Sequence, residues 1–279
     1  MAKLAFVNIG ILLQPFGDPQ VRGFEERIES VFDVAERSQG FVALHGNAPN
    51  VPDMFRAPEF AGRVAQNLSE WQNLESLMAY AYGGLHGEAF AKRKEWIERG
   101  SWPGTAAWWV SDDQPVTWEE AHRRYELLHH RGSSPEAFNF KQAFAPDGAP
   151  YTVDRDAVKK IALENQVRIQ VRDYIAAWNE TESERRLTLL EAVFAQDGQY
   201  TDPSAHAGSR AELSALIGAF QTANPGASFT LEDGIDHHHG HLRFYWSLRF
   251  QTGVELSGMD YAERAADGRL KRIVGFFDA

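Results

Sequence analysis

Two spacings of hydrophobic residues organise the first half of the chain. One alternates at every second position, as in a strand, and the other recurs every three or four positions, as in a helix. The last helical segment begins with the capping box Thr117-Trp-Glu-Glu120 and stops before Gly132. Strands are predicted at 4–9, 41–45, 64–71, 105–110 and 137–144, and helices at 21–35, 74–82, 85–99 and 117–132. This order is close to a doubled βαβ plan, the ferredoxin-like layout in which helices cover one face of an antiparallel sheet.

The second half places its helical spacing before its strand spacing. Helices are predicted at 156–178, 183–195 and 210–222, and strands at 229–233, 240–251, 254–263 and 270–277. Helices followed by a long antiparallel meander predict an α+β domain with one curved sheet. Between the halves, the segment 144–151 is rich in Pro, Asp and Gly, so we place the boundary near Pro150. The expected domains are 1–147 and 156–279.

Composition and charge narrow the class of protein. The 279 residues are 43% hydrophobic and 24% charged, which is typical of a soluble globular protein with one or two cores. No cysteine is present, which excludes disulfides, a thiolate nucleophile and a Cys-ligated zinc. A net charge of −11 without a basic run argues against a nucleic-acid partner. The N-terminus lacks a secretory pattern and no apolar run is long enough for a membrane span, so we expect a cytoplasmic protein with no membrane partner.

Tyr174 is the first candidate for chemistry. Val167, Val171, Tyr174 and Trp178 follow one another at spacings of four, three and four, which puts the tyrosine on the apolar stripe of its helix. A hydroxyl on that stripe needs either a buried partner or a cavity to face. Both a core tyrosine bonded to the backbone and a functional tyrosine fit this pattern.

Two aspartates are the next candidates. Asp202 precedes Pro203, which is ordinarily the signature of a turn. Asp260 alternates with Val254, Leu256 and Gly258 along a predicted strand, and the strand alone does not decide which face is buried. If that face is buried, the pKa of the Asp260 carboxyl is raised and the group can donate a hydrogen bond at neutral pH.

At these residues the second half resembles a known family. The pattern is similar to the nuclear-transport-factor-2-like cone fold, in its SnoaL-like and ketosteroid-isomerase-like branch, over nearly all of 156–279. The segments that carry it are Tyr174-Ile-Ala-Ala-Trp178, Tyr200-Thr-Asp-Pro203, Gly208-Ser-Arg-Ala-Glu-Leu213, Met259-Asp260 and Asp267-Gly-Arg-Leu270. The resemblance implies Asp202 as a general base, with Tyr174 and a protonated Asp260 as donors to an oxyanion. Ketosteroid isomerase is the well-known example of a carboxylic acid kept neutral by an apolar site, so this mechanism comes from the resemblance.

The segment Asp236-His-His-His-Gly-His241 suggests a metal site. If it is a strand, alternate histidines lie nearly 7 Å apart, which is too far for three of them to bind one ion without a bend. We therefore expect no metal and a solvated or dimer-facing row of histidines. His238 shares its face with Phe244 and Trp246, so these three, with Trp178, are predicted to line the substrate pocket.

The first half offers a second candidate pocket. His86, Phe90, Arg93 and Ile97 share one helical face, with Trp96 adjacent, so His86, Arg93 and Trp96 could hold a small anionic or carbonyl ligand. The pattern favours the alternative, a capping histidine and an arginine stacked on tryptophan, because such stacking is common. This half resembles, more weakly, an uncharacterised bacterial branch of the dimeric α/β-barrel superfamily, which includes antibiotic-biosynthesis monooxygenases. The matching segments are Asn67-Leu-Ser-Glu-Trp71, Tyr82-Gly-Gly-Leu-His86, Arg93-Lys-Glu-Trp96 and Trp108-Trp109.

Together these patterns predict an α+β protein, a ferredoxin-like dimeric α/β-barrel domain followed by a cone-shaped barrel. The expected function is a cofactor-independent isomerase, cyclase or lyase acting on a small hydrophobic carbonyl compound. Two alternatives stay open: a non-catalytic binding or assembly protein, and oxygenase chemistry in the first half. With 8 Trp and 8 Tyr, an exposed aromatic sheet face would need a cover, so we expect a homodimer.

Overall fold

The computed structural model describes residues 2–278, apart from the side chain of Leu85. The chain divides into two compact units, Met1–Asn165 and Gln166–Ala279, and each is described by itself. The helix α6 (Arg155–Asn179) begins in the first unit and continues in the second. Within the described residues, no helix combines the length and the apolar character needed to cross a membrane.

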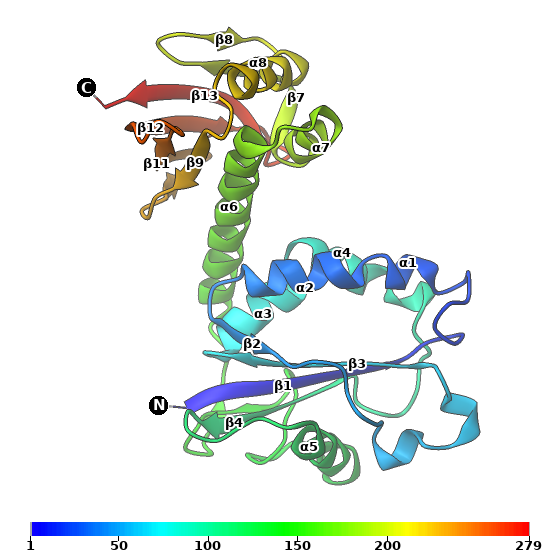
Figure 1. The fold of residues 1–279 in the computed structure, drawn as a ribbon. Helices are drawn as coiled ribbons and strands as arrows, with labels where there is room; N and C mark the ends of the chain where they lie inside the picture. Colours follow the sequence, from blue (N-terminus) through cyan, green and yellow to red (C-terminus); the bar gives the residue numbers. More distant parts are fainter. Residues whose placement is uncertain (1, 279) are drawn as a thin grey trace. The chain divides into compact units, whose positions relative to one another are not determined.

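The first unit is built on a four-stranded antiparallel sheet in the order β2-β3-β1-β4 (Figure 1). The inner strand β1 is largely apolar on both faces, and six of its ten residues are buried. The four strands are β1 (Ala2–Ile11), β2 (Phe41–Leu44), β3 (Val64–Trp71) and β4 (Thr105–Ser111).

Helices cover both faces of this sheet, whereas the sequence predicted helices on one face. In Figure 1, α1 to α4 lie on one side of the sheet and α5 on the other. Val7 and Ile9 of β1 pack with Tyr125 of α5, while Leu4 and Phe6 belong to the core on the opposite face. A strand without a polar face needs a layer on each side, and α5 supplies the second one. The helices are α1 (Arg22–Glu25), α2 (Ile28–Glu36), α3 (Leu74–Tyr82), α4 (Gly84–Lys92) and α5 (Trp118–Arg131), with short 3-10 turns η1 (Asp53–Phe55), η2 (Pro58–Phe60) and η3 (Arg93–Glu95).

The predicted strand at 137–144 is wrong for most of its length. Only β5 (Ala143–Phe144) is a strand, and it pairs with β6 (Pro150–Tyr151). Phe138 forms a single bridge with Ala107, and Phe140 stacks on Phe6 at 5.6 Å between ring centroids. The alternating aromatics of this segment therefore reflect separate contacts with the core and no continuous ladder.

The second unit packs helices against a seven-stranded curved sheet. Its order is β10-β11-β12-β13-β7-β8, with β9 paired to β11; every pair is antiparallel except β13 with β7. The helices are α6, α7 (Ser183–Val193) and α8 (Arg210–Ala223), and the strands are β7 (Phe194–Thr201), β8 (His206–Ala207), β9 (Ser228–Leu231), β10 (Asp236–His238), β11 (His241–Arg249), β12 (Glu255–Arg264) and β13 (Leu270–Phe277). The sequence prediction missed β7, because α7 passes into it without an intervening loop.

Candidate active site

The second unit contains an apolar cavity of about 280 Å³ that is open on one side, with its helices and its sheet as walls. Hydrophobic and aromatic side chains from α6, α8, β9, β11 and β13 form most of its wall. Three polar side chains face the same space from different elements: Tyr174 from α6, Asp202 just after β7, and Asp260 from β12. The structure thus brings the three sequence-predicted catalytic candidates to one cavity.

Asp260 is a buried carboxyl that accepts a hydrogen bond from Trp246. Its side chain is 4% exposed, and the indole Nε1 of Trp246 donates to its Oδ1 at 2.9 Å. Burial raises the pKa of Asp260 from 3.8 to about 6; the hydrogen bond from Trp246 and the nearby Tyr174 hydroxyl oppose this effect, and the Asp202 charge adds to it. Along β12 the residues Gly258, Asp260 and Ala262 are buried. Val254 and Leu256, which the sequence placed on the same face, are 54% and 43% exposed, so the burial of Asp260 comes from other elements.

Tyr174 has a fully buried hydroxyl that lacks a hydrogen-bond partner among the described residues. The stripe predicted on its helix is buried, since Val167, Val171 and Trp178 are at most 6% exposed. Burial raises the pKa of Tyr174 well above its ordinary value, and the Asp260 charge is the next cause. Burying a hydroxyl without a hydrogen-bond partner costs free energy. The Tyr174 hydroxyl therefore marks a position where a ligand oxygen could accept a hydrogen bond.

Asp202 is held by its own loop and by Tyr200. Its Oδ1 accepts from the backbone N–H groups of Ser204 and Ala205, both at 2.6 Å, and from the Ser204 hydroxyl at 2.9 Å. Its Oδ2 accepts from the Tyr200 hydroxyl at 2.8 Å. Burial raises the pKa of Tyr200 far above its usual range, so this phenol stays a donor. The turn role that the sequence suggested for Asp202 therefore coexists with its place at the cavity.

Gly275 on β13 is the position around which these groups gather. A Cβ added there would lie 3.1 Å from Asp260 Oδ1, 3.4 Å from the Asp202 Cβ and 3.6 Å from the Tyr200 hydroxyl. Asp260 pairs directly with Gly275 in the sheet. The absence of a side chain at this one position leaves the space between the two carboxyl groups open.

The predicted pocket residues separate into three kinds. Trp178 and Trp246 line the cavity. Phe244 is fully buried and does not line the cavity; its ring packs edge-on with that of Tyr174, with the ring centroids 5.9 Å apart. The prediction that His238 lines the pocket is wrong, because His238 is exposed in a hairpin. The chain turns at His239 and Gly240, which both have positive φ, so the alternation of the strand does not continue through the turn.

The three residues predicted for a pocket in the first unit do not share one site. His86 lines a cavity under α2, α3 and α4. Arg93 is exposed and packs over the Phe90 ring, 4.0 Å from its centroid. Trp96 is buried elsewhere and carries the Arg27 guanidinium on its ring at 5.2 Å. Arg93 and Trp96 diverge because the helix predicted at 85–99 ends at Lys92 and continues as the 3-10 turn η3.

Sequence reasoning gave no role to Tyr200 or Gly275. The signal for Tyr200 was present, since it stands two residues before Asp202 and a strand puts such residues on one face. Gly275 had no comparable signal, because its importance depends on which strands become neighbours.

Comparisons with known proteins add the following findings. The solved structures similar to this chain include a proposed isomerase of the SnoaL-like family from Agrobacterium tumefaciens, with 32% sequence identity, covering 41% of this chain and 98% of that one, at a TM-score of 0.39. An NTF2-like protein of unknown function from Exiguobacterium is 14% identical, over 39% of this chain and 98% of that one, at a TM-score of 0.34. A proposed SnoaL-like polyketide cyclase from Jannaschia is 11% identical, over 39% and 85%, at a TM-score of 0.32. No curated protein matches the chain.

A family model covers the first part of the chain. It matches residues 3–154, which is more than half of the 279 residues, and its description is Domain of unknown function. The match includes all four strands of the sheet, with β1 from its second residue onward, and the helices on both faces. The chain therefore belongs to the DUF3291 family.

Proposed function

We propose that the cavity of the second unit is an acid–base active site that moves a proton alpha to the carbonyl of a small hydrophobic compound. Isomerases, cyclases and lyases share this step. One observation carries the proposal: the Tyr174 hydroxyl and the buried Asp260 carboxyl line the same apolar cavity, which Asp202 also faces. Donors placed where charge develops are the main source of such catalysis.

Tyr174 and Asp260 act as the donors to the substrate oxygen. When the alpha proton leaves, the carbonyl becomes an enolate and negative charge collects on that oxygen. The Tyr174 hydroxyl makes no well-formed hydrogen bond with a described residue and interacts with the Asp260 carboxyl, so it can donate to a ligand oxygen placed beside that carboxyl. With its pKa raised to about 6, Asp260 holds its proton more readily than an ordinary carboxyl, and an apolar ligand that displaces water strengthens that effect.

Asp202 acts as the base through Oδ2. Its Oδ1 already accepts three hydrogen bonds, while Oδ2 accepts one, from Tyr200. A carboxylate oxygen has two lone-pair directions, so Oδ2 retains room for a proton. The loop bonds fix the orientation of the carboxylate, which a base needs in order to reach its proton.

The substrate class follows from the wall of the cavity. Its lining is largely aromatic and aliphatic, and its volume of about 280 Å³ is near the lower end of small-molecule sites. No Lys or Arg is among its described lining residues, so a carboxylate or phosphate would enter without a counter-charge. A compact, uncharged ketone or enone fits these surroundings.

The test is solvent deuterium exchange alpha to the carbonyl of 2-tetralone or cyclohexanone, after binding is detected by thermal shift. Asp202→Asn is expected to lose exchange by about 10²-fold or more with little change in binding, since the base acts in the transition state. Tyr174→Phe is expected to lose about 10²-fold. Asp260→Asn keeps a neutral donor and is expected to stay within about tenfold of wild type.

The exposed Asp233 supplies the matched control, because Asp233→Asn removes a carboxylate that is not part of the cavity lining. It is expected to match wild type in both assays. Equal exchange in wild type and Asp202→Asn contradicts the assignment of the base. Binding without exchange in any variant favours the alternative that the cavity only binds its ligand.

We also propose the finer fold and assembly. The sheet order β4-β1-β3-β2 with helices between β1 and β2 and between β3 and β4 supports a ferredoxin-like first unit, and the curved sheet supports a cone-shaped second one. Tyr245, Met259 and Phe276 form a cross-strand row, and Tyr245 and Phe276 are exposed on the outer face of the sheet, which supports a homodimer that covers them. Light scattering that gives a 31.4 kDa particle would contradict the dimer.

A further inference from the structure

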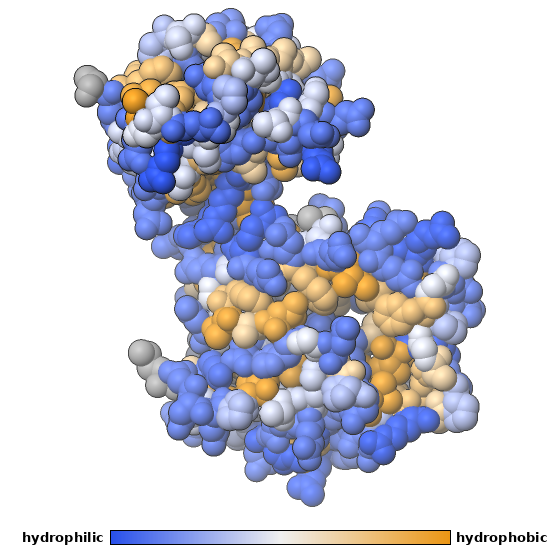
Figure 2. Space-filling model, in the orientation of Figure 1, coloured by the Kyte–Doolittle hydropathy of each residue, from blue (hydrophilic) through white to orange (hydrophobic). Residues whose placement is uncertain are grey.

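The first unit contains a cavity of its own, of about 180 Å³, between its sheet and the helices α2, α3 and α4. Figure 2 shows hydrophobic residues gathered on this unit between its helices and its sheet. Seven aromatic rings line the cavity: Phe6, Phe32, Trp71, Tyr80, Tyr82, Phe90 and Phe140. Phe6 and Phe140 are stacked nearly parallel, with an interplanar angle of 3°. This wall suits a flat ring.

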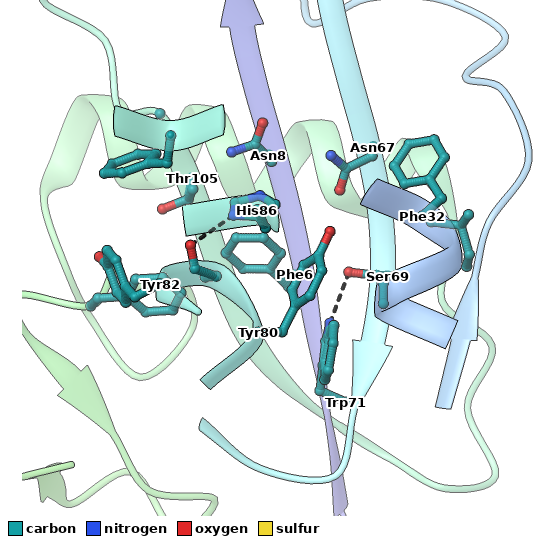
Figure 3. A pocket seen from close by; sticks show the side chains of 16 residues that line it. Phe6, Asn8, Phe32, Asn67, Ser69, Trp71, Tyr80, Tyr82, His86 and Thr105 are labelled. Carbon is teal, nitrogen blue, oxygen red and sulfur yellow. Dashed lines mark hydrogen bonds between the residues drawn. The ribbon is translucent and has the colours of Figure 1, made fainter. Parts of the chain in front are cut away.

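A row of polar side chains crosses the floor of the cavity. Asn8 on β1 pairs with Asn67 on β3 and with Thr105 on β4, so the three residues stand side by side on one face of the sheet. All three line the cavity, as Figure 3 shows. No described residue exchanges a side-chain hydrogen bond with any of them. Two amides and a hydroxyl without partners, on the floor of an aromatic cavity, can bind the polar edge of a ligand.

His86 faces this space from α4 with a defined tautomer. Its Nδ1 lies 2.7 Å from the carbonyl oxygen of Ala81, drawn as a dashed line in Figure 3, and a carbonyl can only accept. Nδ1 therefore carries the proton. Burial lowers the pKa of His86, which keeps the ring neutral and leaves Nε2 with a free lone pair. The ring is also positioned by Tyr80, with centroids 4.7 Å apart.

We propose that this cavity binds a neutral, single-ring phenol, whose hydroxyl donates to Nε2 of His86 and whose edge is bound by Asn8, Asn67 and Thr105. The ligand must bring a donor, because Nε2 of the neutral ring can only accept. It must be flat to lie among the aromatic rings. It must be uncharged, because no Asp, Glu, Lys or Arg is among the described lining residues.

The size of the cavity selects one ring. An engineered cavity of about 150 Å³ holds benzene, so 180 Å³ accommodates a benzene ring with one or two small substituents. A phenol is a stronger hydrogen-bond donor than an aliphatic alcohol and offers a flat face as well. The proposal does not depend on the function proposed for the second unit, because it rests on residues of the first unit alone.

The experiment compares p-cresol with 4-methylanisole, which has a similar shape but no hydroxyl donor, by isothermal titration. Wild type is expected to bind p-cresol about tenfold more tightly, the value of one neutral hydrogen bond. His86→Phe keeps an aromatic ring but loses the acceptor, so p-cresol is expected to weaken by about tenfold while 4-methylanisole is unchanged. His130→Phe is the matched control, because His130 is exposed and outside the cavity lining, and it is expected to bind as wild type does.

A second measurement uses the wild-type chain and does not depend on how a variant folds. The ¹⁵N resonance of His86 Nε2 is expected to move toward the protonated position when p-cresol is added and to stay in place with 4-methylanisole. If p-cresol also bound in the second unit, the titration would show additional binding that remains in His86→Phe, and only the binding lost in that variant would belong to the first unit. Equal affinities for the two probes, or an unmoved Nε2 resonance at saturation, would overturn the proposal.

Discussion

The buried carboxyl of Asp260 is expected to destabilise the folded chain at neutral pH, so that Asp260→Asn is a stabilising substitution. The side chain is 4% exposed and its pKa is raised from 3.8 to about 6. A difference of that size corresponds to about 3 kcal/mol, at 1.36 kcal/mol for each tenfold change in proton affinity. Asparagine keeps the oxygen that accepts from Trp246 and removes the charge, so the destabilisation disappears.

The pH dependence gives this prediction its sign. Below pH 3.8 both the folded and the unfolded chain hold the proton, and Asp260 contributes no difference. As pH rises toward 6, the unfolded chain ionises first while the folded chain retains its proton, so stability falls. The advantage of Asp260→Asn over wild type is therefore expected to reach about 3 kcal/mol at pH 8 and about half of that at pH 5.

Urea unfolding of both proteins at pH 5 and pH 8, followed by tryptophan fluorescence, measures these differences. Asp233→Asn is the control, because its side chain is exposed, and it is expected to stay within about 0.5 kcal/mol of wild type at both values. An advantage of Asp260→Asn that is the same at pH 5 and pH 8, or a loss of stability at pH 8, would refute the reasoning.

Two further substitutions test other parts of the second unit. Gly275→Val is expected to abolish ligand-induced thermal shift in the cavity, because a Cβ there already lies 3.1 Å from Asp260 Oδ1; unchanged binding would show that the ligand sits elsewhere. Arg186→Met is expected to cost about 2–4 kcal/mol in urea unfolding, since the buried guanidinium donates to two backbone carbonyls and one hydroxyl. Arg185→Met, at an exposed neighbouring position, is its control and should be near neutral.

Local signals in the sequence predicted local features of the structure. Thr117 caps α5 by accepting from the Glu120 N–H at 3.3 Å, and Gly132 ends the helix with a φ of +74°. The spacing that put Tyr174 on an apolar stripe is matched by its complete burial. Each of these features depends on residues within a turn or two of one helix, which is the range that a periodic pattern describes.

Features that depend on contacts between distant parts of the chain could not be predicted from local sequence patterns. The aromatic alternation at Phe138 and Phe140 resembled a strand, yet each ring packs separately on the first sheet. His238 was placed in the pocket by an alternation that the positive φ of His239 interrupts. The empty position at Gly275 matters only because β13 lies between β12 and β7, a neighbourhood set by the whole sheet.

The glycine at position 275 also bears on the position of the Asp260 carboxyl. Gly275 lies between Asp260 and Asp202, and because glycine has no Cβ, no side chain separates these two residues. A Cβ at this position would lie 3.1 Å from Asp260 Oδ1, closer than ordinary van der Waals contact, so even Gly275→Ala requires the carboxyl to shift. Any substitution at position 275 therefore acts first on the Asp260 carboxyl, and only through that carboxyl on a ligand.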